Sequence, residues 1–285
     1  MADRKIAIID EIEDLVSQHY ARGDLEKTIL DALAASGKDP DRLVPADLAP
    51  VDEFHTAGRA TTLRALKMIP LKPGMRVLDA GCGLGGTVRV LASERGCLVT
   101  GIDLTPQFVD VARALTARMG LAEQCEFRVG SVTQMPFADA AFDAAVTFHV
   151  AMNVRDRGSF YAELARVMRP DAPLCVFDVM KGPSPGMIYP VPWAETEETS
   201  FLKSSAETSD LLRDAGFRIE QEQSLRAFSI EYFREALAKA ADRAAPPPFG
   251  LHLLTGANAP EKFTNYAKAL GAHQIDPVIL LAWRE

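Results

Sequence analysis

The residues best placed to do chemistry are a glycine-rich segment and two aspartates beside it. Residues 76–86 read RVLDAGCGLGG, in which an apolar run ends at Asp79 and is followed, at GxGxxG spacing, by Gly81, Gly83 and Gly86. Asp103 ends a second apolar run seventeen residues after the last of these glycines. Glycines permit a tight turn and a close approach of backbone to ligand, and a carboxylate at the second position can accept hydrogen bonds from both hydroxyls of a ribose. The spacing predicts a site for a ligand that carries a ribose.

Two kinds of cofactor fit this spacing, because NAD-binding domains show it as well. Asp79 stands two positions before the first glycine, where a carboxylate suits a ligand with an ammonium group, as methionine has. A dinucleotide site instead needs unencumbered backbone amides and a helix N-terminus for its pyrophosphate. About 75 residues precede the glycine segment, whereas many dinucleotide-binding domains begin with this strand. The residues favour a ligand with an ammonium group over a dinucleotide.

Short apolar runs alternate with helical segments around these residues. The predicted strands are Arg76–Ala80, Leu98–Ile102, Glu126–Val129, Asp143–Phe148, Pro173–Val179, Phe217–Glu222 and Pro277–Trp283. The predicted helices between them are Thr87–Arg95, Pro106–Met119, Asp156–Met168 and one that follows Ser204 and ends at Gly216. Such alternation implies an α/β fold in which helices cover both faces of a parallel sheet.

Three stretches lie outside this alternation. Residues 1–55 are predicted to form an N-terminal helical cap. It contains helices in the first twenty residues and over Leu25–Ala35, followed by a connector over Pro40–Pro50. A further helix over Thr56–Ile69 begins the predicted ligand-binding domain of residues 56–285. Within that domain, residues 181–203 form a long loop of the kind that often acts as a lid. Residues 225–273 are predicted to be a helical insertion before the last strand, with two helices separated by Ala-Pro-Pro-Pro.

Composition excludes several other classes of protein. The net charge of −8 argues against a nucleic-acid surface, which would need a basic face. The first residues lack the apolar core of a signal peptide, and no stretch approaches the roughly 20 apolar residues of a membrane span. The four cysteines lack CxxC pairing, so no metal site is expected. We therefore expect a soluble, cytoplasmic protein without membrane or nucleic-acid partners, and a homo-oligomer stays open.

Five segments together resemble the class I S-adenosylmethionine-dependent methyltransferases. They are VLDAGCGLGG, GIDLTP, MPFADAAFD, HVAMNV and ELARVMRP, and the resemblance covers residues 51–219. Within that class the chain is most similar to UbiE-like enzymes and to glycine, sarcosine and dimethylglycine N-methyltransferases. The resemblance implies a Rossmann-like, doubly wound sheet of seven strands in the order 3-2-1-4-5-7-6, with only strand 7 antiparallel. It also implies S-adenosylmethionine as cofactor and S-adenosylhomocysteine as product.

The resemblance carries cofactor contacts to particular residues of this chain. Asp79, Gly81 and Gly83 would line the methionine end, Asp103 would hold the ribose hydroxyls, and Leu104 would pack against the adenine. The remaining contacts would come from His55, Arg59, Ser131, Val132 and His149. At Ser131 the chain departs from the family, which usually has an acidic residue near the adenine amino group. A serine hydroxyl can still accept one hydrogen bond but lacks charge assistance, so the Val132 backbone could make much of this contact.

The acceptor site is expected beyond the carboxyl ends of the strands, where open α/β sheets bind ligands. His149, after the fourth strand, and Asp178, at the end of the fifth, are the candidate catalytic residues. The candidate substrate-binding residues are Met152, Asn153, Tyr189 and Trp193, the last two on the predicted lid loop. An amine acceptor must be neutral to react, which a desolvated pocket or a base such as His149 would favour.

The sequence favours methyl transfer to a small molecule, with N-methylation of an amine such as glycine, sarcosine or dimethylglycine first. O- or C-methylation of a quinone, polyketide or other specialised metabolite is the alternative. An NAD-dependent oxidoreductase and a cofactor-binding module without catalytic activity remain as readings from other classes.

Overall fold

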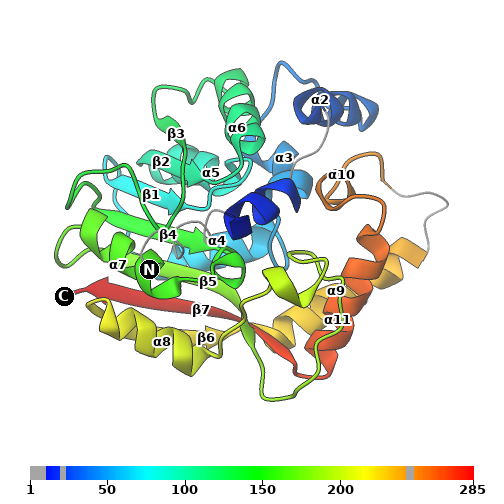
Figure 1. The fold of residues 1–285 in the computed structure, drawn as a ribbon. Coiled ribbons are helices and arrows are strands. Elements are labelled where there is room, and N and C mark those ends of the chain that lie inside the picture. The colour runs from blue at the N-terminus through cyan, green and yellow to red at the C-terminus, as the bar shows by residue number, and fades with distance from the viewer. Residues whose placement is uncertain (1–10, 20–23, 242–246) are drawn as a thin grey trace.

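The computed structural model describes residues 11–19, 24–241 and 247–285, and seven of its strands form one mixed sheet (Figure 1). The strands are β1 (Arg76–Ala80), β2 (Leu98–Asp103), β3 (Cys125–Val129), β4 (Ala144–Phe148), β5 (Pro173–Lys181), β6 (Phe217–Ser224) and β7 (Ile275–Arg284). Their order is β3-β2-β1-β4-β5-β7-β6, and β7 runs antiparallel to both of its neighbours. The predicted topology is confirmed, and it differs from the dinucleotide-binding order 3-2-1-4-5-6.

Helices cover both faces of this sheet because the buried strands are apolar on both sides. On one face α4 (Arg59–Met68), α5 (Gly86–Arg95) and α6 (Pro106–Arg118) pack on strand residues such as Val77 and Val146. On the other face α7 (Arg157–Val167) and α8 (Ser205–Asp214) pack on residues such as Leu78 and Ala145. Successive side chains of a strand point to opposite faces, so β1, β2, β4, β5 and β7 contribute to both cores, while the edge strands β3 and β6 contribute to one core each.

The elements before the sheet differ from the prediction. Residues 11–19 are helical, and α2 (Leu25–Ala35) has its predicted bounds; the rest of the predicted first helix lies outside the described residues. The predicted connector instead contains a helix, α3 (Pro45–Asp52). Proline is favourable at the first position of a helix, and the Asp47 carboxylate accepts the Val44 N–H at 3.0 Å. The prolines that suggested a connector therefore mark a helix start.

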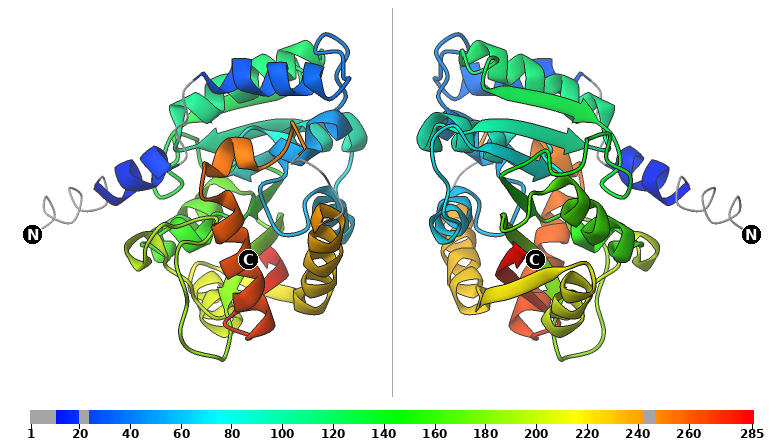
Figure 2. Two further views of the ribbon diagram at one scale, coloured as in Figure 1. Left: turned by 90° about the vertical axis from the view of Figure 1, so that its right-hand side faces the viewer. Right: turned by 90° about the vertical axis from the view of Figure 1, so that its left-hand side faces the viewer.

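The insertion before β7 contains three helices in its described part. They are α9 (Arg226–Ala241), α10 (His252–Thr255) and α11 (Ala259–Gly271), so the prediction of two helices missed the single turn of α10. Figures 1 and 2 show α9 and α11 side by side, and these two helices are in contact. Leu254 of α10 joins Leu25 and Ile29 of α2 and Phe108 of α6 in one apolar cluster. The cap and the insertion thus share a core, and the domain boundary at residue 55 stays a prediction.

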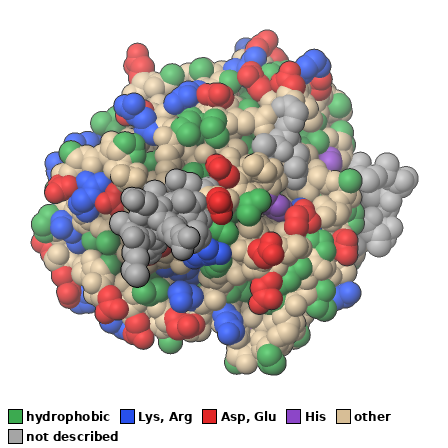
Figure 3. All heavy atoms as spheres, in the orientation of Figure 1, with side chains coloured by type: hydrophobic (Ala, Val, Ile, Leu, Met, Phe, Trp, Pro, Cys, Tyr) green, Lys and Arg blue, Asp and Glu red, His purple; other side chains and the backbone are tan. Residues whose placement is uncertain are grey.

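The described part of the chain contains no helix that is long and apolar enough to cross a membrane. On the face shown in Figure 3, Lys and Arg side chains are interspersed with Asp and Glu side chains.

Candidate active site

A cavity of about 1110 Å³ lies at the carboxyl ends of β1, β2 and β4. Asp79 near the end of β1 and Asp103 at the end of β2 line this cavity, and His149 lines it directly after β4. The rest of its wall comes from the helix of residues 11–19, the segment around α3, the loop of residues 181–203 and the helical insertion. Ligands of open α/β sheets bind beyond this edge, as the sequence predicted for this chain.

The glycine segment forms a turn that brings the backbone to the cavity. The Gly81 N–H donates to the Ile102 carbonyl at 2.8 Å, and the Gly83 N–H donates to the Asp103 carboxylate at 2.8 Å. A Cβ at Gly81 would lie 2.2 Å from the Val150 side chain, so only glycine fits there. A Cβ at Gly83 would meet no atom within 4 Å. Because Gly83 lines the cavity, its bare backbone leaves this space open to a ligand.

Asp79 and Asp103 differ in how their carboxylates are satisfied. Asp103 accepts the N–H groups of Gly83 and Thr105, at 2.8 and 2.9 Å. Asp79 is 2% exposed, and among the described residues none donates a hydrogen bond to its carboxylate. Burial, followed by the charges of Asp103 and Glu53, raises the pKa of Asp79 to about 8. Burial also raises the pKa of Asp103, against the two backbone hydrogen bonds. Asp79 is therefore a buried acceptor that faces the cavity and that no described residue supplies with a donor.

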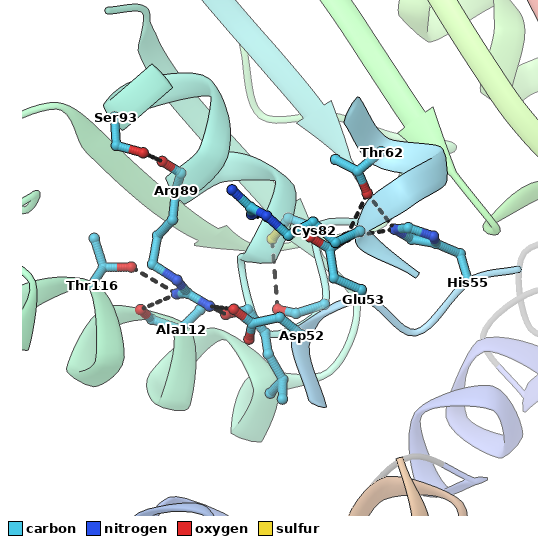
Figure 4. Close-up of polar contacts among 12 residues, drawn as sticks. Asp52, Glu53, His55, Thr62, Cys82, Arg89, Ser93, Ala112 and Thr116 are labelled. Atoms are coloured by element: carbon cyan, nitrogen blue, oxygen red, sulfur yellow. Dashed lines mark hydrogen bonds and ion pairs between the residues drawn. The ribbon is translucent and has the colours of Figure 1, made fainter. Parts of the chain in front are cut away.

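Buried charged side chains form a network that contacts the glycine segment (Figure 4). Arg89 of α5 is fully buried and donates to the Asp52 carboxylate of α3 at 2.6 Å and to the Leu84 carbonyl at 2.7 Å. The pair thus joins the helix before the sheet to the helix that follows the glycines.

His55 and Arg59 were both predicted to contact the cofactor, and the structure separates them. His55 lines the cavity, with its Nε2 2.9 Å from the Glu53 carboxylate and 3.0 Å from the Thr62 hydroxyl. Arg59 begins α4 and pairs with Glu94 of α5, outside the cavity lining. The structure therefore does not bring Arg59 to the cavity, contrary to the prediction, because Glu94 on the neighbouring helix holds its guanidinium.

His149 follows β4 with φ of +56°, a conformation that few residues other than glycine adopt. Its N–H donates to the Phe177 carbonyl at 2.7 Å, and its ring lies with its centroid 4.7 Å from that of Phe177. Burial and then His55 hold the pKa of His149 well below its usual 6.5, so the imidazole is neutral at pH 7. The Thr56 N–H faces Nε2 at 3.4 Å. Because an N–H can only donate, Nε2 carries the lone pair.

Tyr266 and Thr56 complete a polar group beside His149 that the sequence did not reveal. Tyr266 of α11 is 3% exposed, and its hydroxyl is hydrogen-bonded to the Thr56 hydroxyl. That Thr56 hydroxyl lies 3.4 Å from His149 Nε2. The Tyr266 ring contacts Phe233 and Trp193, with ring centroids 5.2 and 6.0 Å apart. Residues more than 200 positions apart thus meet at one place in the cavity wall.

Asp178 does not line the cavity, contrary to the prediction that it stands at a strand end. β5 continues to Lys181, so Asp178 lies within the strand and is 1% exposed. Its carboxylate accepts the Ala151 N–H at 2.9 Å. Burial raises its pKa to about 6, against the charge of Arg157 and the N–H groups of the turn. Asp178 therefore supports the turn that carries Met152 and Asn153, and it is not among the residues that line the cavity.

The part of the cavity between the loop of residues 181–203 and the insertion is apolar and aromatic. Met152, Trp193, Phe233 and Phe263 line it together with Tyr266. Asn153 also lines the cavity, and its side chain donates to the carbonyls of Trp193 and Thr199, at 2.9 and 3.0 Å.

Several contacts fix the loop of residues 181–203 against the rest of the wall. Tyr189, predicted to bind substrate, instead packs in the apolar cluster behind Trp193. Glu195 pairs at 2.6 Å with Lys262 of α11, whose side chain is fully buried. The structure does not bring Tyr189 to the cavity, contrary to the prediction, because its ring packs against the apolar cluster. Trp193 lines the cavity, as predicted.

A third part of the cavity lies past the end of β3. Leu104, Ser131 and Val132 line it, as predicted for the cofactor residues. The helix of residues 11–19 covers this part, and its Glu13 carboxylate accepts a hydrogen bond from the Ser131 hydroxyl. Nothing in the sequence pattern pointed to Glu13, because an acidic residue on a predicted amphipathic helix is usually solvent-exposed.

Comparison with known proteins agrees with this geometry. Residues 78–176 match a family model described as a methyltransferase domain. An O-methyltransferase from Pyrenophora dematioidea is 29% identical over 173 residues, which cover 60% of this chain and 64% of that protein. A 24-methylenesterol C-methyltransferase from Oryza sativa subsp. japonica is 36% identical over 121 residues, or 42% and 33% of the two chains. Norajmaline N-methyltransferase from Rauvolfia serpentina is 36% identical over 107 residues, or 38% and 37%. The chain thus spans from a third to under two thirds of these curated relatives.

Solved structures share the fold at lower identity. The 4+2 cyclase SpnF has a TM-score of 0.68 and 24% identity, with 94% of both chains covered. Phosphoethanolamine N-methyltransferase 2 from Haemonchus contortus, solved with S-adenosylhomocysteine, has a TM-score of 0.66 and 18% identity over 82% of this chain and 54% of that one. The matched segment contains the glycine turn, Asp103 and His149, and the sheet order is not that of a dinucleotide-binding domain. Residues 78–176 are therefore similar to a methyltransferase domain, and they lie in a sheet of the order 3-2-1-4-5-7-6.

Proposed function

We propose that this chain transfers the methyl group of S-adenosylmethionine to a largely apolar small molecule. The observation that carries the proposal is Asp79, a buried carboxylate without a hydrogen-bond donor among the described residues, at the floor of a large cavity. A carboxylate in that state suits a ligand that brings its own ammonium group. The open space at Gly83 and the carboxylate of Asp103, which would bind the ribose, lie in the same cavity.

The residues present fit this cofactor. Asp79 would bind the ammonium group, Gly81 and Gly83 would leave room for the methionine chain, and Asp103 would bind the ribose hydroxyls. Leu104 and Val132 would flank the adenine. When bound, the cofactor supplies a methyl group already activated on a sulfonium, so the protein has to align the acceptor and exclude water.

The chemistry of the wall favours an apolar acceptor over glycine. Trp193, Phe233 and Phe263 surround the space beside His149 with aromatic rings. A glycine-type acceptor carries a carboxylate, and Arg155 is the one Lys or Arg side chain among the described residues of the lining. Arg155 is itself exposed and lies 5.2 Å over the Phe201 ring. The N-methylation of glycine, sarcosine or dimethylglycine, which the sequence ranks first, therefore ranks second to methylation of an apolar metabolite.

His149 is the group best placed to receive a proton from the acceptor. Its neutral imidazole carries a lone pair on Nε2, and it lines the cavity between the cofactor residues and the aromatic wall. Because the lone pair on Nε2 accepts the Thr56 N–H at 3.4 Å, an acceptor hydroxyl, amine or acidic C–H would have to displace this contact before its proton could pass to Nε2 as the new bond to the methyl carbon forms. Asp178 acts indirectly, through the turn that it supports.

Two measurements test the proposal. Calorimetry should show that the protein binds S-adenosylmethionine and S-adenosylhomocysteine and that NAD binds far more weakly; preferred binding of NAD would overturn it. A screen with methyl-labelled cofactor over phenols, quinones, polyketides and amines should label apolar compounds ahead of glycine. Labelling of glycine or sarcosine alone would restore the amine assignment, and cofactor binding without any transfer would favour a module without catalytic activity.

A further inference from the structure

The helix of residues 11–19 (dark blue in Figure 1) contributes one part of the cavity wall. Ile12, Glu13 and Val16 line the cavity from this helix. At the other end of the helix, His19 Nε2 lies 3.3 Å from the Pro192 carbonyl of the loop of residues 181–203. The helix is thus tied both to the end of β3 and to the aromatic wall.

Glu13 is the charged side chain of this helix that faces inward. Its carboxylate accepts a hydrogen bond from the Ser131 hydroxyl and lies 3.4 Å from the Thr133 hydroxyl. The two hydroxyls are 2.8 Å apart, and the Thr133 N–H donates to Ser131 Oγ at 3.1 Å. A carboxylate is only an acceptor, so this corner of the cavity presents one negatively charged acceptor beside two adaptable hydroxyls.

The strand register places this corner next to Asp103. Asp103 of β2 is paired with Val129 of β3, and the Gly130 N–H donates to the Asp103 carbonyl at 3.0 Å. Ser131, which follows Gly130, therefore lies in the cavity wall beside Asp103, the residue proposed to bind the ribose. Apolar side chains, Leu104 and Val132 below and Ile12 and Val16 from the helix, line the same stretch. The result is a slot with apolar walls and an acceptor at its edge.

We propose that Glu13 recognises the exocyclic amino group of the cofactor's adenine. This inference rests on the proposed function, because it takes the nucleoside to lie with its ribose at Asp103. The amino group of adenine donates to the carboxylate, while Ser131 and Thr133 turn their hydroxyls to the neighbouring ring nitrogen or to each other. A base with an oxo group at that position would set an acceptor against the carboxylate, which repels it. Glu13 thus makes the N-terminal helix a specificity element for adenine.

The experiment compares S-adenosylhomocysteine with S-inosylhomocysteine, in which the amino group is replaced by an oxo group, by calorimetry. The unaltered chain should bind the adenine form roughly 10- to 100-fold more tightly, as loss of a hydrogen bond to a charged group implies. Glu13→Ala should lower the affinity for the adenine form by a similar factor and bring the two ligands to within a few-fold of each other. Asp14→Ala, on the exposed side of the same helix, removes the same charge and should change neither affinity.

A rescue separates recognition from loss of structure. Because Ser131 Oγ touches the Glu13 carboxylate, Ser131→Asp in the Glu13→Ala background places a carboxylate at the same corner and should restore the preference for adenine. The inference is overturned if Glu13→Ala binds the adenine form as the unaltered chain does, or if it loses both ligands equally. Failure of the unaltered chain to bind S-adenosylhomocysteine at all would overturn the proposed function as well, which distinguishes the two failures.

Discussion

The two halves of the cavity are built in opposite ways. The centre of the proposed cofactor half consists of residues close together in sequence, the glycine turn and the ends of β1 and β2, to which Glu13 and Ser131 are added at one end, and its chemistry is carboxylate, hydroxyl and backbone N–H. The acceptor half joins residues from the α3–α4 segment, the loop of residues 181–203 and α11, and its chemistry is aromatic. The positions of residues at strand ends are therefore determined by the order of the strands in the sheet. The positions of residues on the added segments depend instead on how those segments pack on one another.

The largest expected effect tests how the cofactor half is held. Asp52→Ala leaves the guanidinium of Arg89 buried without its carboxylate, and breaking a buried ion pair in this way costs about 3–5 kcal/mol of unfolding free energy. Urea denaturation measures it. Asp110→Ala, which removes an exposed partner of Arg113, is the control and should change little. Equal effects of the two variants would show that the buried pair is not what anchors α3 to α5.

Asp103→Ala should weaken binding of S-adenosylhomocysteine by about 1.5–3 kcal/mol, the range for a hydrogen bond to a charged group. The variant also removes the acceptor for the Gly83 and Thr105 N–H groups. Asp103→Asn keeps one acceptor oxygen, so its affinity for S-adenosylhomocysteine should fall less than that of Asp103→Ala. Calorimetry gives both values, and unchanged affinity in Asp103→Ala would place the ribose elsewhere.

The raised pKa of Asp79 gives cofactor binding a pH dependence. The ammonium group binds the ionised carboxylate, and the pKa is about 8 in the folded chain. Affinity for S-adenosylhomocysteine should therefore rise roughly tenfold per pH unit between about pH 6 and pH 8. Folding has the opposite sign: above the ordinary aspartate pKa of 3.8 the unfolded chain releases a proton that the folded chain keeps, so the contribution of Asp79 to stability falls as pH rises toward 8. Asp79→Asn should flatten both profiles, and a flat binding profile for the unaltered chain would count against Asp79.

The smallest effect concerns the acceptor half. Tyr266→Phe removes the hydroxyl that pairs with Thr56 and should cost about 0.5–1.5 kcal/mol of stability, the net worth of one hydrogen bond. Once an acceptor is identified, its KM or the kcat should change while affinity for S-adenosylhomocysteine does not. Loss of cofactor affinity in this variant would break the separation of the two halves.

The sequence predicted the cofactor half of the cavity better than the acceptor half. The strands and the positions of Asp79, Asp103 and His149 at the cavity were predictable, because glycine spacing and strand ends are local features. The strand order was predictable only from the resemblance to a known family. Arg59 and Tyr189 were misplaced because their directions depend on partners elsewhere, Glu94 on α5 and the cluster around Trp193. Asp178 was misplaced because the strand runs two residues further than its apolar pattern suggested.

The residues that were missed share another cause. Thr56, Tyr266 and Glu13 come from the segment before α4, from α11 and from the helix of residues 11–19, and they reach the cavity only through the packing of these segments on the rest of the chain. No periodicity in the sequence reports such packing between distant segments. For the same reason, the pattern could show that residues 225–273 are helical but not which of their side chains face a ligand.

The pair of Glu195 and Lys262 has a consequence for chimeric enzymes. It ties the loop of residues 181–203 to α11 at 2.6 Å, and Asn265 of α11 donates to the Pro190 carbonyl of the same loop at 2.9 Å. If recombination replaced the loop but not the insertion, the fully buried ammonium of Lys262 would keep only the Thr255 carbonyl that it contacts at 3.1 Å. An unpaired buried charge is strongly destabilising. Crossovers that carry both segments from one parent keep the pair intact, so a chimera should exchange the loop and the insertion together.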